Sequence, residues 1–398
     1  MTISAEKLPI SVDNERQFVI GFGDPVMDII AHVSNDFLRD IADNDIGGCI
    51  PVNSSEMSHL LEKTSGVSSL HSKPGGSAAN VTRVLANIAP GQFHCRFVGM
   101  VGPDSTGKEY RYDLSQQHVE PLLLVKPDAS LADSESARAL CWVTPDGQRT
   151  MRTCLGASLG LRSSSQLPED WLSASNGSMN QLSPAQLLHL EGYALYRPQL
   201  VQEVIPEAKA KGCLVSIDLA SFELVKSVVS KHSDGDEGEQ KQALPEALLN
   251  SLIKSKNLDL IFANEEEACE LSTALGVARE DDTVATKVAA AQRFVTLNGG
   301  CKAFVISLGA RGCVASDYKG QLFYGAADKV KVVDTIGAGD AFTAGFLAGF
   351  LMDLPLDRCC AAGCIAGGEA VQIEGAELPR EAYERVEARI NALKKQNT

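Results

Sequence analysis

The sequence predicts an α/β/α sandwich with a mostly parallel central sheet and a small β lid. Short apolar runs alternate with segments of helical periodicity along most of the 398 residues. Because strands buried on both faces read as continuous apolar runs, these strands should lie side by side between two layers of helices. The predicted strands are 17–23, 96–102, 187–193, 213–219, 258–264 and 303–309. The helix-like segments include 78–88, 198–211, 265–275, 283–297 and 380–395.

Two stretches depart from this alternation. Residues 30–53 and 122–153 contain strand-like pieces that do not fit β-α-β units. We interpret them as a lid, approximately 30–60 and 120–155, inserted into a single domain of residues 1–398. A ligand is then expected between the lid and the carboxyl ends of the parallel strands. The polar, acidic segment 231–242 is predicted to be a flexible loop.

Composition excludes several classes of protein. The formal net charge of −15 disfavours nucleic-acid and anionic-membrane partners. The most apolar run, 341–352, is too short to span a bilayer, and the first residues lack a signal or transit pattern. Eleven dispersed cysteines without a C-x-x-C pair indicate a reducing compartment. We therefore expect a cytoplasmic protein; the sequence leaves its oligomeric state open.

The segment from Asp334 to Asp340, DTIGAGD, points most specifically to chemistry. A strand-like VKVVD run ends at Asp334, and the small-residue turn after it opens directly into an apolar helix. The backbone N–H groups of Gly337, Ala338 and Gly339 would form an anion hole at the helix start, suited to a transferring phosphoryl group. Asp340 could accept the proton of an attacking hydroxyl. The alternative, that Asp340 only caps the helix, stays open at this point.

Two segments together resemble a known family. Residues 334–346, DTIGAGDAFTAGF, are similar to the C-terminal signature of the ribokinase/PfkB family of carbohydrate and nucleoside kinases. Residues 74–81, PGGSAANV, resemble its N-terminal signature, in the family's order and at about its separation. The resemblance covers roughly residues 18–379. It implies a ribokinase-like fold, ATP as phosphoryl donor and Mg²⁺. Activation by a monovalent cation is common in the family, but the sequence places no ligands for it.

The resemblance also implies a metal and nucleotide side. Asn264 and Glu267 match the family's N-x-x-E motif, which implies that they organise Mg²⁺ and its waters. An Asn-capped helix with an acidic first turn explains the same residues, and both roles can hold together. The next strand and turn, VISLGARG, resemble the part that lies against the nucleotide. The nucleotide-binding residues implied there are Ser307, Gly309 and Gly312.

On the acceptor side, the opening GFGDPVMDI resembles that of adenosine kinases within the family. Asp28 matches the acid that grips the sugar hydroxyls, although it could also simply end a strand at a turn. Further substrate-side matches are Gly75, Gly76 and Asn80. Arg149 lies at the tip of a predicted lid hairpin. It would contact substrate when the lid closes or remain a solvated side chain.

The predicted reaction transfers phosphate from ATP to a hydroxymethyl group of a sugar or nucleoside. An adenosine-like nucleoside is slightly favoured, but Ala79 stands where adenosine kinases usually carry Gln. Fructose, ribose and other nucleosides remain open, as does a non-catalytic regulatory subunit. Two other motifs are incomplete: the P-loop-like segment 102–108 is followed by Glu109 rather than Ser or Thr, and Pro25 interrupts a dinucleotide-like G-F-G.

Overall fold

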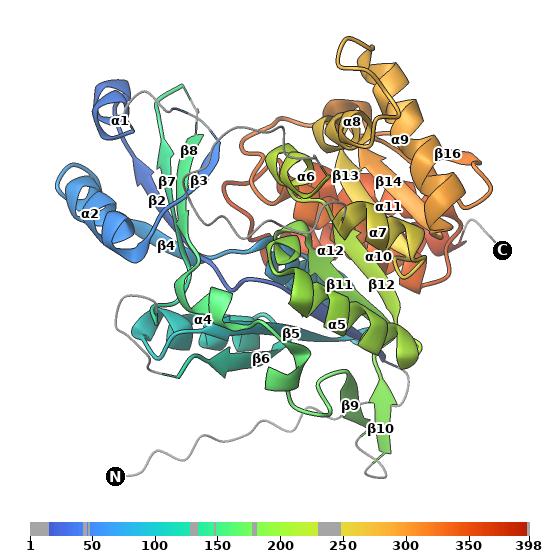
Figure 1. The fold of residues 1–398 in the computed structure, drawn as a ribbon, viewed down its shortest axis with the longest axis horizontal. Coiled ribbons are helices and arrows are strands. Elements are labelled where there is room, and N and C mark those ends of the chain that lie inside the picture. The colour runs from blue at the N-terminus through green and yellow to red at the C-terminus, as the bar shows by residue number, and fades with distance from the viewer. Residues whose placement is uncertain are drawn as a thin grey trace, which may run out of the picture.

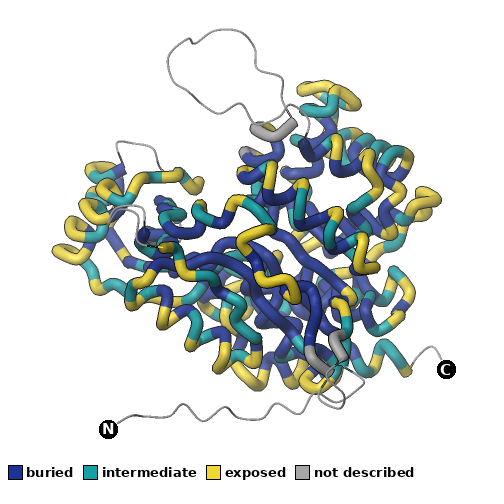
Figure 2. Tube along the Cα trace, turned by 60° about the horizontal axis from the view of Figure 1, so that its bottom comes forward, coloured by how far each residue is buried: buried dark blue, intermediate teal, exposed yellow. Residues whose placement is uncertain are grey.

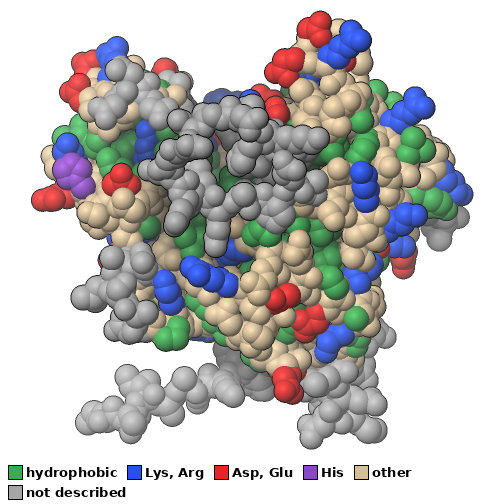
Figure 3. Space-filling view, in the orientation of Figure 1, with side chains coloured by type: hydrophobic (Ala, Val, Ile, Leu, Met, Phe, Trp, Pro, Cys, Tyr) green, Lys and Arg blue, Asp and Glu red, His purple; other side chains and the backbone are tan. Residues whose placement is uncertain are grey.

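The computed structural model describes residues 16–42, 46, 48–127, 134–146, 149–176, 181–229 and 248–395. The acidic loop predicted at 231–242 lies outside these residues. No helix in the described ranges is long and apolar enough to cross a bilayer. On the face seen in Figure 3, acidic and basic side chains are interspersed over the lid and the main body.

A central sheet organises the main body (Figure 1). Within the described residues it has nine strands in the order β16-β15-β14-β13-β12-β11-β1-β5-β6. Neighbours from β6 to β14 pair in parallel, and β15 and β16 are antiparallel additions. The predicted parallel sheet is confirmed. The bounds are β1 Gln17–Phe22, β5 Phe93–Val101, β6 Val119–Val125, β11 Leu187–Glu191, β12 Leu214–Asp218, β13 Leu260–Asn264, β14 Ala303–Ser307, β15 Cys313–Ser316 and β16 Leu322–Gly325.

Helices cover both faces of this sheet. Successive side chains of a strand point to opposite faces, and β1 shows the result. Val19 joins one hydrophobic core, while Phe18, Ile20 and Phe22 join the other. The first core packs on α3 (Ser77–Ile88), α4 (Ser105–Gln116), α10 (Ala338–Leu351), α11 (Leu356–Ala370) and α12 (Arg380–Lys395). The second packs on α5 (Pro198–Ala210), α6 (Phe222–Val229), α7 (Leu248–Lys254), α8 (Glu265–Ala274) and α9 (Val284–Gly299).

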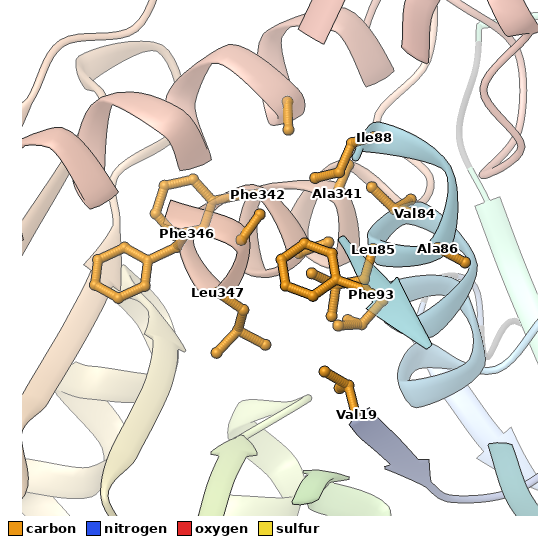
Figure 4. Packing of buried hydrophobic residues seen from close by; sticks show 14 of the residues in the cluster. Val19, Val84, Leu85, Ala86, Ile88, Phe93, Ala341, Phe342, Phe346 and Leu347 are labelled. Carbon is orange, nitrogen blue, oxygen red and sulfur yellow. The ribbon is translucent and has the colours of Figure 1, made fainter. Parts of the chain in front are cut away.

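The first core fixes the helix that carries the candidate base. Figure 4 shows Phe342, Phe346 and Leu347 of α10 packed near Val84 and Leu85 of α3. Phe346 also meets Phe262 of β13 edge to face, with ring centroids 5.3 Å apart. The strands beneath are buried along most of their length (Figure 2). Helices α3 and α10 therefore start at fixed positions relative to the carboxyl ends of the strands.

The lid is a separate small sheet at one side of the main body (Figure 1). Five described strands form it in the order β3-β8-β7-β2-β4. Helices α1 (Asn35–Ile41) and α2 (Ser54–Ser65) pack on it around Leu38, Met57 and Trp142. The lid strands are β2 Met27–His32, β3 Cys49–Pro51, β4 His71–Pro74, β7 Arg138–Val143 and β8 Arg149–Cys154. A short hairpin of β9 (Ser173–Asn176) and β10 (Gln181–Pro184) lies apart from both sheets.

Two local predictions were wrong. The run Val119–Val125, assigned in part to the lid, is β6 and pairs with β5 at an edge of the central sheet, because an apolar run suits either sheet equally. The strand-like VKVVD run that ends at Asp334 is not a strand, and its Val332 and Val333 are 59% and 58% exposed. The Val333 N–H donates to the carbonyl of Val371 just past α11 (2.7 Å), so the run is held at a helix end.

Candidate active site

A cavity of about 410 Å³ lies between the lid and the carboxyl ends of the central strands. Asp28 enters it from the lid strand β2, and Asp218 and Asn264 enter from the ends of β12 and β13. Gly337 and Asp340 reach it from the start of α10. The topology therefore brings residues that are more than 300 positions apart to the sheet edge where ligands of α/β folds bind.

Asp340 is held in place by helix α3. One carboxylate oxygen accepts a hydrogen bond from Ser77 Oγ and the other from Asn80 Nδ2, both at 2.7 Å. The N-cap of α10 is Gly337, and no side chain caps this helix. The carboxylate of Asp340 thus faces α3 and the cavity and does not cap its own helix.

Gly337 can only be glycine at this turn. Its φ of +69° lies in the left-handed region, and a β-carbon there would lie 2.5 Å from Cβ of Ala376. Gly337 and Gly339 both line the cavity. The third residue of the predicted anion hole differs from expectation: the N–H of Ala338 donates to the carbonyl of Thr335 at 3.3 Å, because the turn folds back on itself.

The surroundings of Asp340 shift the pKa of its carboxyl in opposing directions. Loss of water contact raises the pKa of its carboxyl. The hydrogen bonds from Asn80 and Ser77 and the nearby charge of Arg83 act in the opposite direction. The balance leaves the pKa above its ordinary value, which makes the ionised form a better proton acceptor than a solvated aspartate.

Arg83, which the sequence did not single out, orients Asn80. Its buried guanidinium donates to Asn80 Oδ1 (2.8 Å), which turns the Nδ2 group of Asn80 toward Asp340. Arg83 also donates to the carbonyls of Pro74 (2.9 Å) and Gly75 (3.2 Å). Its spacing was a usable signal: Ser77, Asn80 and Arg83 recur every three residues and so share one face of α3.

Gly75 and Gly76 act through their lack of a side chain. A β-carbon on Gly75 would lie 2.1 Å from Asp28 Oδ2, and one on Gly76 would lie 2.5 Å from the carbonyl oxygen of Asp24. Gly76 also has a φ of +89°. Neither glycine lines the cavity. Gly75 lets the chain pass close beside the Asp28 carboxylate, and Gly76 lets it pass close beside the backbone of Asp24.

Three carboxylates face one another across the cavity. The pKa of Asp28 is raised to about 7, chiefly by burial; the charge of Arg83 opposes this rise and the charge of Asp340 adds to it. Burial also raises the pKa of Asp218 to about 6, and Asp340 contributes there too. Asp218 accepts hydrogen bonds from Thr343 Oγ1 (3.0 Å) and the N–H of Ala220 (3.1 Å). Such a site favours ligands that bring hydroxyl donors or cations.

Asp218 was missed in the sequence, although a signal was present. It is the carboxylate at the end of a predicted buried strand, and ligands gather at such ends in parallel sheets.

Asn264 and Glu267 form a reciprocal helix cap. Asn264 Oδ1 accepts from the Glu267 N–H, and Glu267 Oε2 accepts from the Asn264 N–H, both at 2.8 Å. Both residues also line the cavity. Within the described residues, no cluster of three or more His, Cys, Asp or Glu side chains could hold a metal. The hard oxygen donors present do suit Mg²⁺ bound largely through water and phosphate.

The remaining predicted residues fall into two groups. Ser307 lines the cavity, whereas Gly309 and Gly312 do not. With φ of +56° and +88°, these glycines turn the chain from β14 into β15. Arg149 does not line the cavity either. It forms an ion pair with the buried Asp334 and thereby ties lid strand β8 to the loop before Gly337.

Comparison with known proteins supports the fold. Adenosine kinase 2 of Arabidopsis thaliana is 24% identical over 380 residues, covering 93% of this chain and 98% of its own length. The structure of a probable sugar kinase from Rhizobium etli CFN 42 aligns with a TM-score of 0.74 at 24% identity, over 95% of this chain and 99% of its own. That of adenosine kinase from Sinorhizobium meliloti aligns with a TM-score of 0.71 at 24% identity, over the same shares of both chains.

A family model assigns the chain. The model of the pfkB family carbohydrate kinases matches residues 46–382. This span contains both signature segments and most of the cavity. The protein therefore belongs to the PfkB family of carbohydrate kinases, which use ATP to phosphorylate small molecules.

Proposed function

We propose that this kinase phosphorylates the hydroxymethyl group of a nucleoside, with an adenosine-like nucleoside favoured. The observation that carries the proposal is the position of the Asp340 carboxylate. Ser77 and Asn80 hold it by hydrogen bonds next to the glycine turn, and it lines the same cavity as Asp28. One acid can then hold the hydroxyls of the acceptor while the other receives the proton.

The transfer follows from these positions. Asp28 binds hydroxyls of the acceptor ring and directs its hydroxymethyl oxygen toward Asp340. As that oxygen forms a bond to the γ-phosphorus of ATP, its proton passes to Asp340 and the bond to ADP breaks. The N–H groups of Gly337 and Gly339 stabilise the charge on the phosphoryl oxygens. Mg²⁺, held with its waters near Asn264 and Glu267, would neutralise charge on the phosphates.

The lid surface favours a nucleoside over a free sugar. Ile30 of β2 is level with Cys141 of β7, which is level with Met151 of β8, so the three side chains form one apolar row facing the cavity. Asp28 lies two residues before Ile30 on the same face. An acceptor with hydroxyls at one end and a flat apolar group at the other would cover both parts, whereas a hexose would leave the row uncovered.

The relatives support both acceptor classes. The similarity to adenosine kinases of Arabidopsis thaliana and Sinorhizobium meliloti supports a nucleoside. A sugar acceptor is the second candidate, because the PGGSAANV segment has the form of sugar kinases and the Rhizobium etli protein is called a probable sugar kinase.

A panel of acceptors tests the choice. We expect ADP release from ATP to show the highest kcat/KM with a purine nucleoside, well above ribose and fructose. Higher kcat/KM with a free sugar would assign the second candidate. Absence of turnover with every acceptor would instead favour a non-catalytic role. Repeating the panel in sodium and potassium buffers tests activation by a monovalent cation.

Replacing Glu267 tests the proposed metal side. Glu267→Gln can still accept from the Asn264 N–H, but its amide loses the hydrogen bond that Asn264 Nδ2 donates to Glu267 Oε1 (2.8 Å), so the melting temperature should fall modestly while the protein still folds. Loss of the negative charge should raise the Mg²⁺ concentration needed for half-maximal rate by about 10- to 100-fold. Glu266→Gln is the matched control, because Glu266 is exposed on the same helical turn and does not line the cavity. An unchanged Mg²⁺ requirement in Glu267→Gln would remove Glu267 from the metal site.

A further inference from the structure

The cavity carries an excess of negative charge that phosphoryl transfer must overcome. Its lining carboxylates are Asp28, Asp218, Glu267, Asp340 and Glu377. Among the described residues that line it, Lys73 is the one basic side chain. A phosphoryl group that enters this cavity brings further negative charge. A positively charged side chain in the cavity would offset the repulsion between that group and the carboxylates.

Lys73 projects from the lid toward the cavity. In β4 it lies directly opposite Asp28 of β2 in an antiparallel pair, so both side chains leave the same face of the lid sheet. Lys73 is exposed and forms no ion pair with any residue in the described ranges. Its ammonium group is therefore not already neutralised by a carboxylate.

The ammonium group also lies close to Gly375, whose neighbour in the chain contacts the glycine turn of α10. Nζ of Lys73 is 3.5 Å from the position that a β-carbon on Gly375 would occupy. The N–H of Gly375 donates to Asp334 Oδ2 at 2.8 Å, and the following residue, Ala376, packs against Gly337. Lys73 and the glycines of the proposed anion hole therefore line one cavity, with residues 375–376 between them.

We propose that Lys73 is a further catalytic residue, whose ammonium group binds the non-bridging oxygens of the phosphoryl group during transfer. This inference rests on the proposed function. Lys73 keeps its protons throughout: the phosphorus–oxygen bond to ADP breaks, the bond to the acceptor oxygen forms, and the released proton goes to Asp340. Arg149 cannot serve in the same way here, because it is engaged with Asp334 outside the cavity lining.

Kinetics of Lys73 variants test the proposal. Lys73→Met should lower kcat by about 10²–10³-fold, as removal of a charge-stabilising donor does elsewhere, with little change in acceptor KM. Lys73→Arg should recover part of the loss because it restores the positive charge. Lys63→Met is the matched control, since Lys63 is an exposed lid lysine that does not line the cavity. A lysine that only positioned the lid would raise the acceptor KM instead.

A binding measurement tests Lys73 without turnover. ADP with aluminium fluoride mimics the transferring phosphoryl group, and calorimetry should show that Lys73→Met weakens its binding by about the factor lost in kcat, while ADP alone binds as to wild type. Equal binding of the mimic to both proteins, or a variant that keeps its kcat, would overturn the role of Lys73 and leave the proposed function standing. A wild-type protein that phosphorylates no acceptor would instead refute the proposed function.

Discussion

Asp340→Asn should lower kcat by about 10²–10⁴-fold, the range typical for loss of a general base, while the protein still folds. The contacts of Asp340 explain why folding survives. The Oδ1 of an Asn can still accept from Asn80 Nδ2, and its Nδ2 can donate to Ser77 Oγ, because a hydroxyl accepts as well as donates. Removing a partly desolvated charge also relieves a cost of folding. Only the capacity to take a proton is lost.

Steady-state kinetics and a thermal melt on the same sample separate catalysis from folding. The loss should appear mainly in kcat. Asp357→Asn is a suitable control, since Asp357 is an exposed acid in the first turn of the adjacent helix α11 and lies outside the cavity. If Asp340→Asn melts like wild type and retains most of its kcat, Asp340 is not the base.

The strands of the central sheet could be predicted because each is a short apolar run buried on both faces. The same property misled at β6, where the run from Val119 to Val125 does not reveal which of two sheets it joins. It misled again at Val332 and Val333, which have the composition of a strand but are exposed beside the end of α11. Pairing across long sequence separations decides such cases, and local composition does not contain it.

Some residues of the site could be predicted from local sequence, and others could not. Asp28, Asn264, Glu267 and Asp340 stand in recognisable segments, and the structure brings all four to one cavity. The ion pair of Arg149 with Asp334 joins residues 185 positions apart. The sequence around either residue gives no indication that the other is its partner. The sequence likewise did not single out Lys73, because its proposed role depends on the pairing of β4 with β2 that places it opposite Asp28.

Because its pKa is raised, Asp28 should make both the stability of the protein and the binding of the acceptor depend on pH. The folded protein holds the proton up to about pH 7, whereas the unfolded chain releases it near 3.8. This group's contribution to stability is therefore fully present below about pH 4 and is lost as the pH rises through about 7. The ionised form is nevertheless the one that binds hydroxyls best, since hydrogen bonds to a charged acceptor are the stronger ones. Acceptor binding should accordingly weaken as the pH falls below about 7.

Asp28→Asn should therefore raise the acceptor KM by about 10- to 100-fold, because each hydrogen bond to a charged group contributes roughly 1.5–3 kcal/mol. The KM for ATP should change little. The variant should melt higher than wild type at pH 8, where the buried charge is costly, and equally at pH 4. Asp40→Asn is the control, an exposed aspartate on the lid helix α1. An Asp28→Asn protein with weakened ATP binding and normal acceptor binding would mean that the two ends of the cavity are assigned the wrong way round.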